Sequence, residues 1–223
     1  NFKNNFGTSL GKKKIDVKEL YKKKYSLKLF NKTLTKTGPR KLFYAENNLT
    51  SLDLAHSAYR NFTRKNIKFN KSKVYNLIFV TETNNYKFPG NSFLFASKIK
   101  LKSDTNLYDL NSGCTGFVDA LDLANQLKGN SLIVCAETYS KHIKEFNRST
   151  SSLFSDGASV FYFNKKNVQV IKTFKSFRKD SFNDLCTKES ELFMDGKKVF
   201  EFVNFEVVNL LKKIIKKNKK IKI

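Results

Sequence analysis

Apolar and polar positions along this chain follow two periods in turn. Short continuous apolar runs, rich in β-branched and aromatic residues, predict buried strands. The runs that predict strands are residues 74–81, 107–110, 131–136 and 158–163, and a further strand is predicted to begin within 168–173.

Apolar residues at helical spacing predict helices between these runs. Thr50 or Ser51 could cap the first of them. The predicted helices cover residues 50–63, 91–99, 115–127 and 196–217, and a short surface helix is predicted within 11–24. Strands that alternate with helices indicate a layered α/β fold with a mainly parallel or mixed sheet.

The run NSGCTGFVDAL, residues 111–121, places Cys114 between Gly113 and Gly116, at the turn from a predicted strand to a predicted helix. Unpaired N–H groups and the positive end of the dipole at a helix N-terminus favour a thiolate. The glycines permit a tight turn and the close approach of a substrate. The pattern predicts a nucleophilic cysteine on a sharp elbow.

The alternative for Cys114 is an inert core cysteine, which is the usual role of a single cysteine between apolar segments. Cys135, inside a predicted strand, is interpreted as a core residue. The third cysteine is Cys186, and the odd number and spacing of the three fit neither a metal cluster nor a dense disulfide framework. We therefore predict no metal site and a reducing, cytoplasmic setting.

The length of 223 residues and the 40% hydrophobic content allow a sizeable core. No apolar stretch reaches the length of a membrane span, and the first residues lack the apolar segment of a signal peptide. Because the chain begins with asparagine, we expect it to be incomplete at that end.

The formal net charge of +24 raises the question of a nucleic-acid partner. Only five of the 43 basic residues are arginine, the residue on which sequence-specific readers depend for bidentate base contacts. This bias disfavours nucleic-acid binding. A surface suited to an acidic carrier protein or a phosphorylated cofactor remains compatible with the charge.

Five segments, in order, resemble β-ketoacyl-acyl carrier protein synthase III, a condensing enzyme of the thiolase superfamily. The cysteine segment and FSDGAS at the expected separation are the most specific. The segments are GTSLGKKKIDVKEL (7–20), TKTGPR (35–40), TETNNYKFPG (81–90), NSGCTGFVDAL (111–121) and NRSTSSLFSDGASV (147–160).

The resemblance implies a thiolase-like layered fold with a mixed sheet and a buried helix that starts at the cysteine elbow. Residues 1–165 would form the N-terminal half, which carries the nucleophile. Residues 166–223 would form the first strand and helix of a C-terminal half that is incomplete in this chain.

The same resemblance implies site residues. Cys114 would accept the acyl group, and its backbone N–H would form part of an oxyanion hole. Arg148 and Lys36 would contact coenzyme A, and Phe88 would reach the active site of the partner subunit in a homodimer. Arg148 could equally form a surface ion pair with Glu145, and Phe88 could be an ordinary core residue.

Asp156 and Gly157 are interpreted as turn-forming residues. Family members use a histidine and an asparagine of their second half to assist decarboxylation. His56 and His142 lie outside such a context and are expected to be structural or surface residues.

The implied function is an acyltransferase without a bound cofactor, which takes an acyl group from acyl-coenzyme A and condenses it with malonyl-acyl carrier protein in fatty-acid or related biosynthesis. The isolated 223-residue chain is expected not to complete the condensation. Three alternatives stay open: a non-catalytic or partner-dependent subunit, a specialised acyl transferase that uses the same acyl-enzyme, and a nucleic-acid-binding α/β domain.

Overall fold

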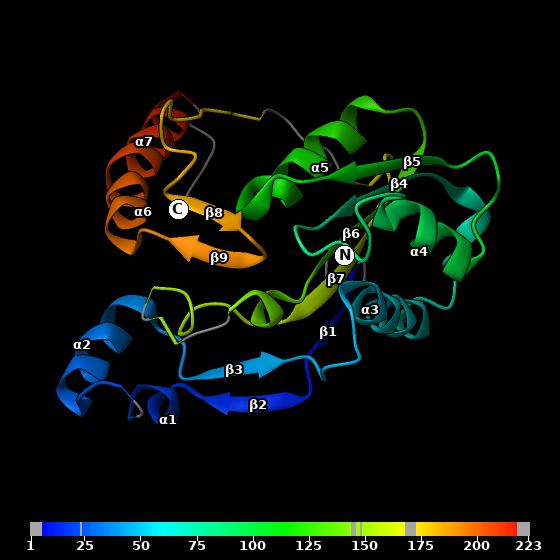
Figure 1. Cartoon of the computed structure of the whole chain (residues 1–223). Coiled ribbons are helices and arrows are strands. Elements are labelled where there is room, and N and C mark those ends of the chain that lie inside the picture. Colours follow the sequence, from blue (N-terminus) through cyan, green and yellow to red (C-terminus); the bar gives the residue numbers. More distant parts are fainter. Residues whose placement is uncertain (1–5, 23, 144–145, 148, 168–172, 218–223) are drawn as a thin grey trace.

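The computed structural model describes residues 6–22, 24–143, 146–147, 149–167 and 173–217. Its centre is a five-stranded mixed sheet in the order β1-β7-β6-β4-β5 (Figure 1). β4, β5 and β6 are parallel, whereas β7 runs antiparallel to both β6 and β1. The strands are β1 (Phe6–Leu10), β4 (Val74–Val80), β5 (Asn106–Leu110), β6 (Asn130–Glu137) and β7 (Gly157–Phe163).

Helices cover both faces of this sheet, which explains why its central strands are apolar at nearly every position. α3 (Ser51–Lys65) and α4 (Asn91–Ile99) pack on one face, and α5 (Gly116–Gln126) packs on the other (Figure 1). Successive residues of β4 divide between the two cores: Leu77 and Phe79 face α3 and α4, whereas Ile78 and Val80 face α5. The result is a three-layer α/β/α arrangement, as the apolar runs predict.

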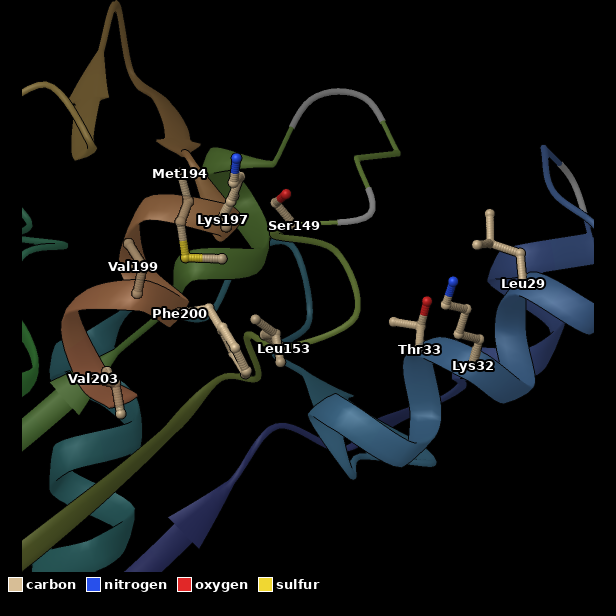
Figure 2. Close-up of a pocket in the computed structure, with 11 residues that line it drawn as sticks. Leu29, Lys32, Thr33, Ser149, Leu153, Met194, Lys197, Val199, Phe200 and Val203 are labelled. Atoms are coloured by element: carbon tan, nitrogen blue, oxygen red, sulfur yellow. The ribbon is translucent and has the colours of Figure 1, made fainter. Parts of the chain in front are cut away.

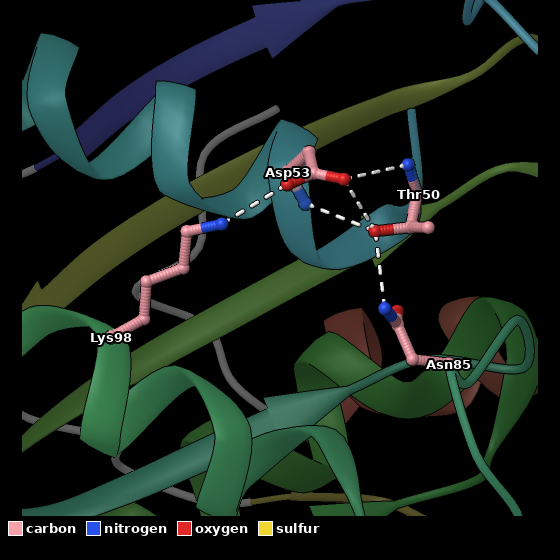
Figure 3. A network of polar contacts seen from close by, with 4 residues as sticks. All are labelled: Thr50, Asp53, Asn85 and Lys98. Carbon is pink, nitrogen blue, oxygen red and sulfur yellow. Dashed lines mark hydrogen bonds and ion pairs between the residues drawn. The ribbon is translucent and has the colours of Figure 1, made fainter. Parts of the chain in front are cut away.

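The start of α3 is fixed by a capping box. The Thr50 hydroxyl accepts a hydrogen bond from the Asp53 N–H, while the Asp53 carboxylate accepts one from the Thr50 N–H at 3.0 Å. Lys98 of α4 pairs with Asp53 at 3.0 Å, and Asn85 donates to the Thr50 hydroxyl at 3.2 Å. Figure 3 shows these contacts around the start of the helix. The cap therefore ties α3 to α4 and to the loop after β4.

Replacing Thr50 with alanine is expected to lower the free energy of unfolding by about 1 kcal/mol, because the Asp53 N–H and the side-chain amide of Asn85 lose their acceptor. Urea denaturation measures this change. The matched control is Thr63→Ala in the last turn of the same helix, where the hydroxyl only bonds the Arg60 carbonyl oxygen. An equal effect of the two substitutions would contradict this account of the cap.

A second unit is built on the edge of the sheet. β2 (Lys13–Asp16) pairs antiparallel with β3 (Lys41–Tyr44), and α1 (Val17–Lys22) and α2 (Leu27–Thr37) flank them. A small core holds this unit together, formed by Val17, Tyr21, Phe30 and Leu42.

A third unit follows the sheet. β8 (Leu185–Lys188) and β9 (Glu191–Met194) form a hairpin. It leads into a continuous helical stretch made of α6 (Gly196–Phe202), a π-helical turn η5 (Val203–Val207) and α7 (Val208–Lys217).

The predicted elements agree with the observed ones to within a few residues, apart from the surface helix and the last strand. The predicted surface helix within 11–24 is half strand, because β2 precedes α1. The strands β1 and β3, the helix α2 and the hairpin β8–β9 lack a counterpart among the predicted elements. The strand predicted to begin within 168–173 falls on residues outside the described part, and Thr173 itself is not in a strand.

Candidate functional site

The site lies at the end of the sheet where the C-terminal residues of three parallel strands are side by side. Val80 of β4 is in register with Leu110 of β5 and with Cys135 of β6. The residues that follow these strands therefore meet at the same edge, which is where open α/β sheets bind their ligands. Beyond that edge lies the β8–β9 hairpin (Figure 1), and β9 contacts η4 (Tyr139–His142), the turn after β6.

Cys114 lies in the turn that follows β5. The 3₁₀ turn η3 (Gly113–Thr115) leads directly into α5, and the thiol is exposed. Gly113 has a φ of +52°, a conformation that a β-carbon would strain. At Gly116 a β-carbon would lie 2.3 Å from Cγ1 of Val80, so only glycine lets α5 begin this close to β4. The strand, turn and helix around Cys114 are as predicted, and the exposed thiol contradicts the inert-core alternative.

Glu137, the last residue of β6, brings a carboxyl group to the same edge. Its Oε1 accepts from the Glu82 N–H at 2.8 Å, and its Oε2 accepts from the Thr83 hydroxyl at 2.8 Å. Burial raises the pKa of Glu137 to about 7, with a smaller contribution from the charge of Glu82; the hydrogen bonds oppose the rise. Sequence reasoning missed both glutamates, although a Glu-Thr pair directly follows each of two buried runs, at 82–83 and 137–138.

The same surroundings keep the Tyr139 hydroxyl and the Cys135 thiol protonated. Burial raises the pKa of Tyr139, and the charges of Glu137, Glu82 and Cys114 add to the rise. Burial, followed by the charge of Glu137, raises the pKa of the Cys135 thiol to about 12. Cys135 is therefore a protonated, partly buried thiol, in agreement with its interpretation as a structural residue.

Glu137 should make stability depend on pH. Because its pKa is raised from 4.5 to about 7, the folded state binds this proton more tightly than the unfolded state, and stability falls as the pH rises between these values. Glu137→Gln cannot titrate and should gain stability relative to the native protein between pH 5 and pH 8, by about 2–3 kcal/mol. Urea unfolding at both pH values measures the change.

The matched control is Glu46→Gln, since Glu46 is exposed. It should leave the pH dependence of the native protein unaltered. A Glu137→Gln variant with the same pH dependence as the native protein would contradict the raised pKa.

A cavity of about 600 Å³ opens between α2 and α6. Figure 2 shows Leu29, Lys32 and Thr33 on one side and the α6 residues on the other, with the segment around Ser149 and Leu153 between them. The remaining lining residues are Met194, Gly196, Lys197, Val199, Phe200 and Val203. The cavity is thus mainly apolar, with a lysine on each side.

The other predicted site residues are Arg148, Lys36 and Phe88. Arg148 and Glu145 lie outside the described residues, and the side chain of Lys36, in α2, is also outside them. In the sequence, Arg148 directly precedes Ser149, and Lys36 is one helical turn after Lys32. Phe88 is 89% exposed at the end of the loop after β4, so its interpretation as a core residue is wrong.

The two histidines are in structural or surface positions, as expected. Burial, and then the charges of Lys98 and Arg60, lower the pKa of His56 in α3. His142 places Nδ1 3.1 Å from the carbonyl oxygen of Ser190 and so links η4 to the β8–β9 hairpin.

α5 also carries partly exposed apolar and acidic groups. Phe117, whose ring packs against Phe161 of β7, and Val118 are 40% and 48% exposed. Lys175 pairs with Asp119 at 3.2 Å and with Asp122 at 2.9 Å, which ties the helix to the segment after the sheet. α5 is therefore buried on its sheet face through Ala120 and Ala124, while the opposite face is partly open.

Within the described residues, no group of three or more His, Cys, Asp or Glu side chains could hold a metal ion. In the same part of the chain, none of the helices combines the length and the apolar character needed to cross a membrane.

The segment that contains Cys114 matches a known protein family. Residues 108–178 match the family described as 3-oxoacyl-[acyl-carrier-protein (ACP)] synthase III. A β-ketoacyl-[acyl-carrier-protein] synthase III of Coxiella burnetii is 31% identical over 163 residues, which are 66% of this chain and 51% of that protein.

Solved structures show the same fold. The chain superimposes on a 3-oxoacyl-(acyl-carrier-protein) synthase III with a TM-score of 0.83 and 21% identity, covering 95% of this chain and 72% of the other. The priming β-ketosynthase of the R1128 polyketide pathway gives a TM-score of 0.80 at 23% identity, over 92% and 66% of the two chains.

The chain spans about half the length of the curated relatives it matches. The matched segment contains Cys114 and its turn, and the mixed α/β fold is the thiolase-like fold of the solved structures. By sequence and fold together, this chain is similar to the β-ketoacyl-[acyl-carrier-protein] synthase III family, whose model matches its residues 108–178.

Proposed function

We propose that the protein is an acyl-transferring condensing enzyme of fatty-acid or related biosynthesis, with Cys114 as the acyl-accepting nucleophile. The observation that carries this proposal is the exposed Cys114 thiol at a strand–turn–helix elbow, inside the segment that matches the family. Residues 1–165 would supply the nucleophile, and residues 166–223 would begin the second half of the enzyme.

The first half-reaction uses groups of this chain. The Cys114 thiolate attacks the thioester carbonyl carbon of acyl-coenzyme A, and a carbon–sulfur bond forms as the carbonyl oxygen becomes an oxyanion. The Cys114 backbone N–H would donate to that oxyanion. The coenzyme A thiolate then leaves and takes up a proton, and the acyl group stays on Cys114.

The second half-reaction rests on the family relationship alone. Malonyl-acyl carrier protein loses carbon dioxide, and the resulting enolate attacks the acyl carbonyl carbon. A carbon–carbon bond forms, the bond to Cys114 breaks, and a β-ketoacyl-carrier product leaves. Family members assist this step with a histidine and an asparagine of their second half.

The test is to supply the purified protein with acetyl-coenzyme A and malonyl-acyl carrier protein and to measure free coenzyme A and the β-ketoacyl product. Release of coenzyme A that leaves the acyl group on the protein supports the first half-reaction, which is the part expected of the isolated 223-residue chain. Product formation would show that the chain completes the condensation as well. Release of coenzyme A with transfer to another acceptor would support the specialised transferase instead. A folded protein that releases none would contradict the proposal and favour the partner-dependent subunit.

The cavity between α2 and α6 is the proposed entrance for the phosphorylated part of coenzyme A. Lys32 and Lys197 lie on its two sides and would attract the phosphates. Arg148 and Lys36, next to lining residues in the sequence, are proposed to add to this attraction.

Reversing both charges, with Lys32→Glu and Lys197→Glu, is therefore expected to raise the KM for acetyl-coenzyme A about tenfold with little change in kcat. The same variant should react normally with the acetyl thioester of N-acetylcysteamine, which lacks phosphates. Lys18→Glu, on exposed α1, is the matched control. An unchanged KM for acetyl-coenzyme A would place the entrance elsewhere.

We also propose that the protein forms a homodimer through the loop after β4. Its tip carries Tyr86 and Phe88, which are 60% and 89% exposed. Two large aromatic side chains this exposed on one loop favour a protein contact, and Phe88 would reach the partner's active site. Sedimentation of the protein and of Phe88→Asp tests this, since a dimer that persists unchanged in the variant would contradict it.

A further inference from the structure

Two glutamates join the three strand ends at which Cys114 is presented. Glu82 follows β4, Glu137 ends β6, and the turn of Cys114 follows β5. Because β4 lies between β5 and β6 in the sheet, Glu82 lies between the other two. The position of Glu82 lets it contact the cysteine turn on one side and Glu137 on the other.

The contact with the cysteine turn is direct. Oε1 of Glu82 accepts a hydrogen bond from the Gly113 N–H at 2.6 Å. Gly113 directly precedes Cys114 and has a positive φ, so its peptide determines the direction in which the thiol and the Cys114 N–H point. The hydrogen bond therefore holds the turn at Gly113, its residue with a positive φ.

Glu82 is itself held in place. Its backbone N–H donates to Oε1 of Glu137 at 2.8 Å. The adjacent Thr83 hydroxyl donates to Oε2 of Glu137 and accepts from the Thr138 N–H at 3.0 Å. Thr83 and Thr138 are both buried. These hydrogen bonds form a continuous polar connection from the end of β6, through Glu82, to the N–H of Gly113, the residue before the cysteine.

We propose that Glu82 is a positioning residue for Cys114, which holds the N–H of Gly113 so that the thiol and the Cys114 N–H face the substrate together. Glu137 in turn holds Glu82 in place by accepting from its backbone N–H. The proposal rests on the proposed function in one respect, since the thiol must be used as an acyl acceptor for the positioning to affect a reaction.

Two substitutions of Glu82 can separate the effect of its hydrogen bond to Gly113 from the effect of its negative charge. Glutamine keeps a carbonyl oxygen at the position of Oε1 and can still accept from the Gly113 N–H. Alanine removes the acceptor. If Glu82 acts through this hydrogen bond, Glu82→Gln should resemble the native protein and Glu82→Ala should not. If Glu82 acts through its negative charge, the two variants should behave alike.

The first measurement concerns the hydrogen bond itself and needs no activity. Amide hydrogen exchange of Gly113 should be accelerated about tenfold or more in Glu82→Ala and only slightly in Glu82→Gln. Glu46→Ala, an exposed glutamate substitution, is the control and should leave this amide unchanged. Equal Gly113 exchange in Glu82→Ala and the native protein would overturn the proposal.

The second measurement compares two reactions of Cys114. Acylation by acetyl-coenzyme A needs both the placed thiol and the oxyanion donor, whereas alkylation by iodoacetamide needs only the thiol. Glu82→Ala is expected to lose about 10- to 100-fold in the acylation rate, as misplaced groups do, while alkylation of Cys114 changes less than about threefold. Cys186 alkylation in the same samples is the internal reference. Glu82→Gln should restore acylation.

The outcomes separate the two proposals. A native protein that is never acylated, but whose Gly113 exchange depends on the acceptor at position 82, contradicts the proposed function and leaves the hydrogen bond supported. A native protein that is acylated at the same rate as Glu82→Ala overturns the positioning role and leaves the function supported. Equal loss in Glu82→Ala and Glu82→Gln also overturns it, since charge would then be the cause.

Discussion

Replacing Cys114 with alanine is expected to abolish acyl transfer, with a loss of at least about 10³-fold in the rate of coenzyme A release. The substitution removes the sulfur that forms the acyl-enzyme and leaves the backbone of the turn unchanged. Because the Cys114 side chain is exposed, the variant should fold with nearly native stability. The measurement is coenzyme A release from acetyl-coenzyme A by the two proteins at equal concentration.

The matched control is Cys186→Ala, on the β8–β9 hairpin. Its thiol only approaches the carbonyl oxygen of Asn183, at 3.8 Å, so its removal should leave the rate within about twofold of the native value. A Cys114→Ala variant that retains the native rate would show that another group accepts the acyl chain.

The second large effect concerns stability. Asp156→Ala is expected to lower the free energy of unfolding by about 4 kcal/mol, because it leaves buried donors without an acceptor. The Asp156 carboxylate is fully buried and accepts from the Ala45 N–H at 2.7 Å and the Ser140 N–H at 2.9 Å, as well as from the Ser140 hydroxyl. It thus connects the β2–β3 unit, the turn after β6 and the start of β7.

Urea denaturation measures the loss. Asp156→Asn keeps one oxygen acceptor and should lose roughly half as much. Asp104→Ala, at an exposed position, should stay within about 0.5 kcal/mol of the native protein. An Asp156→Ala variant of native stability would contradict the connecting role that the structure gives to this carboxylate.

The helices and strands that could be predicted from the sequence are those whose pattern of buried and exposed positions can be read from a single segment of the chain. β4 is a continuous apolar run because α4 and α5 cover its two faces, and α3 carries its own start and stop signals, from Thr50 to Asn66. The turn of Cys114 could be predicted because glycines at 113 and 116 permit a sharp turn and a close approach to β4 that other residues would not. Local chemistry determines these features, so local patterns reveal them.

The features that were missed depend on contacts distant in sequence. The Glu82–Glu137 connection forms because β4 and β6 are neighbours in the sheet, and strand order cannot be read from either segment alone. β2 is four residues long and owes its pairing to β3, 25 or more residues away. α2 is different: Ser26 caps it and Leu27, Phe30 and Leu34 are spaced as on one helical face, so the sequence did contain a usable signal.

Intact mass spectrometry shows whether Cys114 carries the acyl group. After incubation with acetyl-coenzyme A, we expect one acetyl adduct per chain, located on Cys114 by peptide mapping and absent from Cys114→Ala. An adduct on Cys135, Cys186 or a lysine, or a folded native protein that gains none, would contradict this expectation.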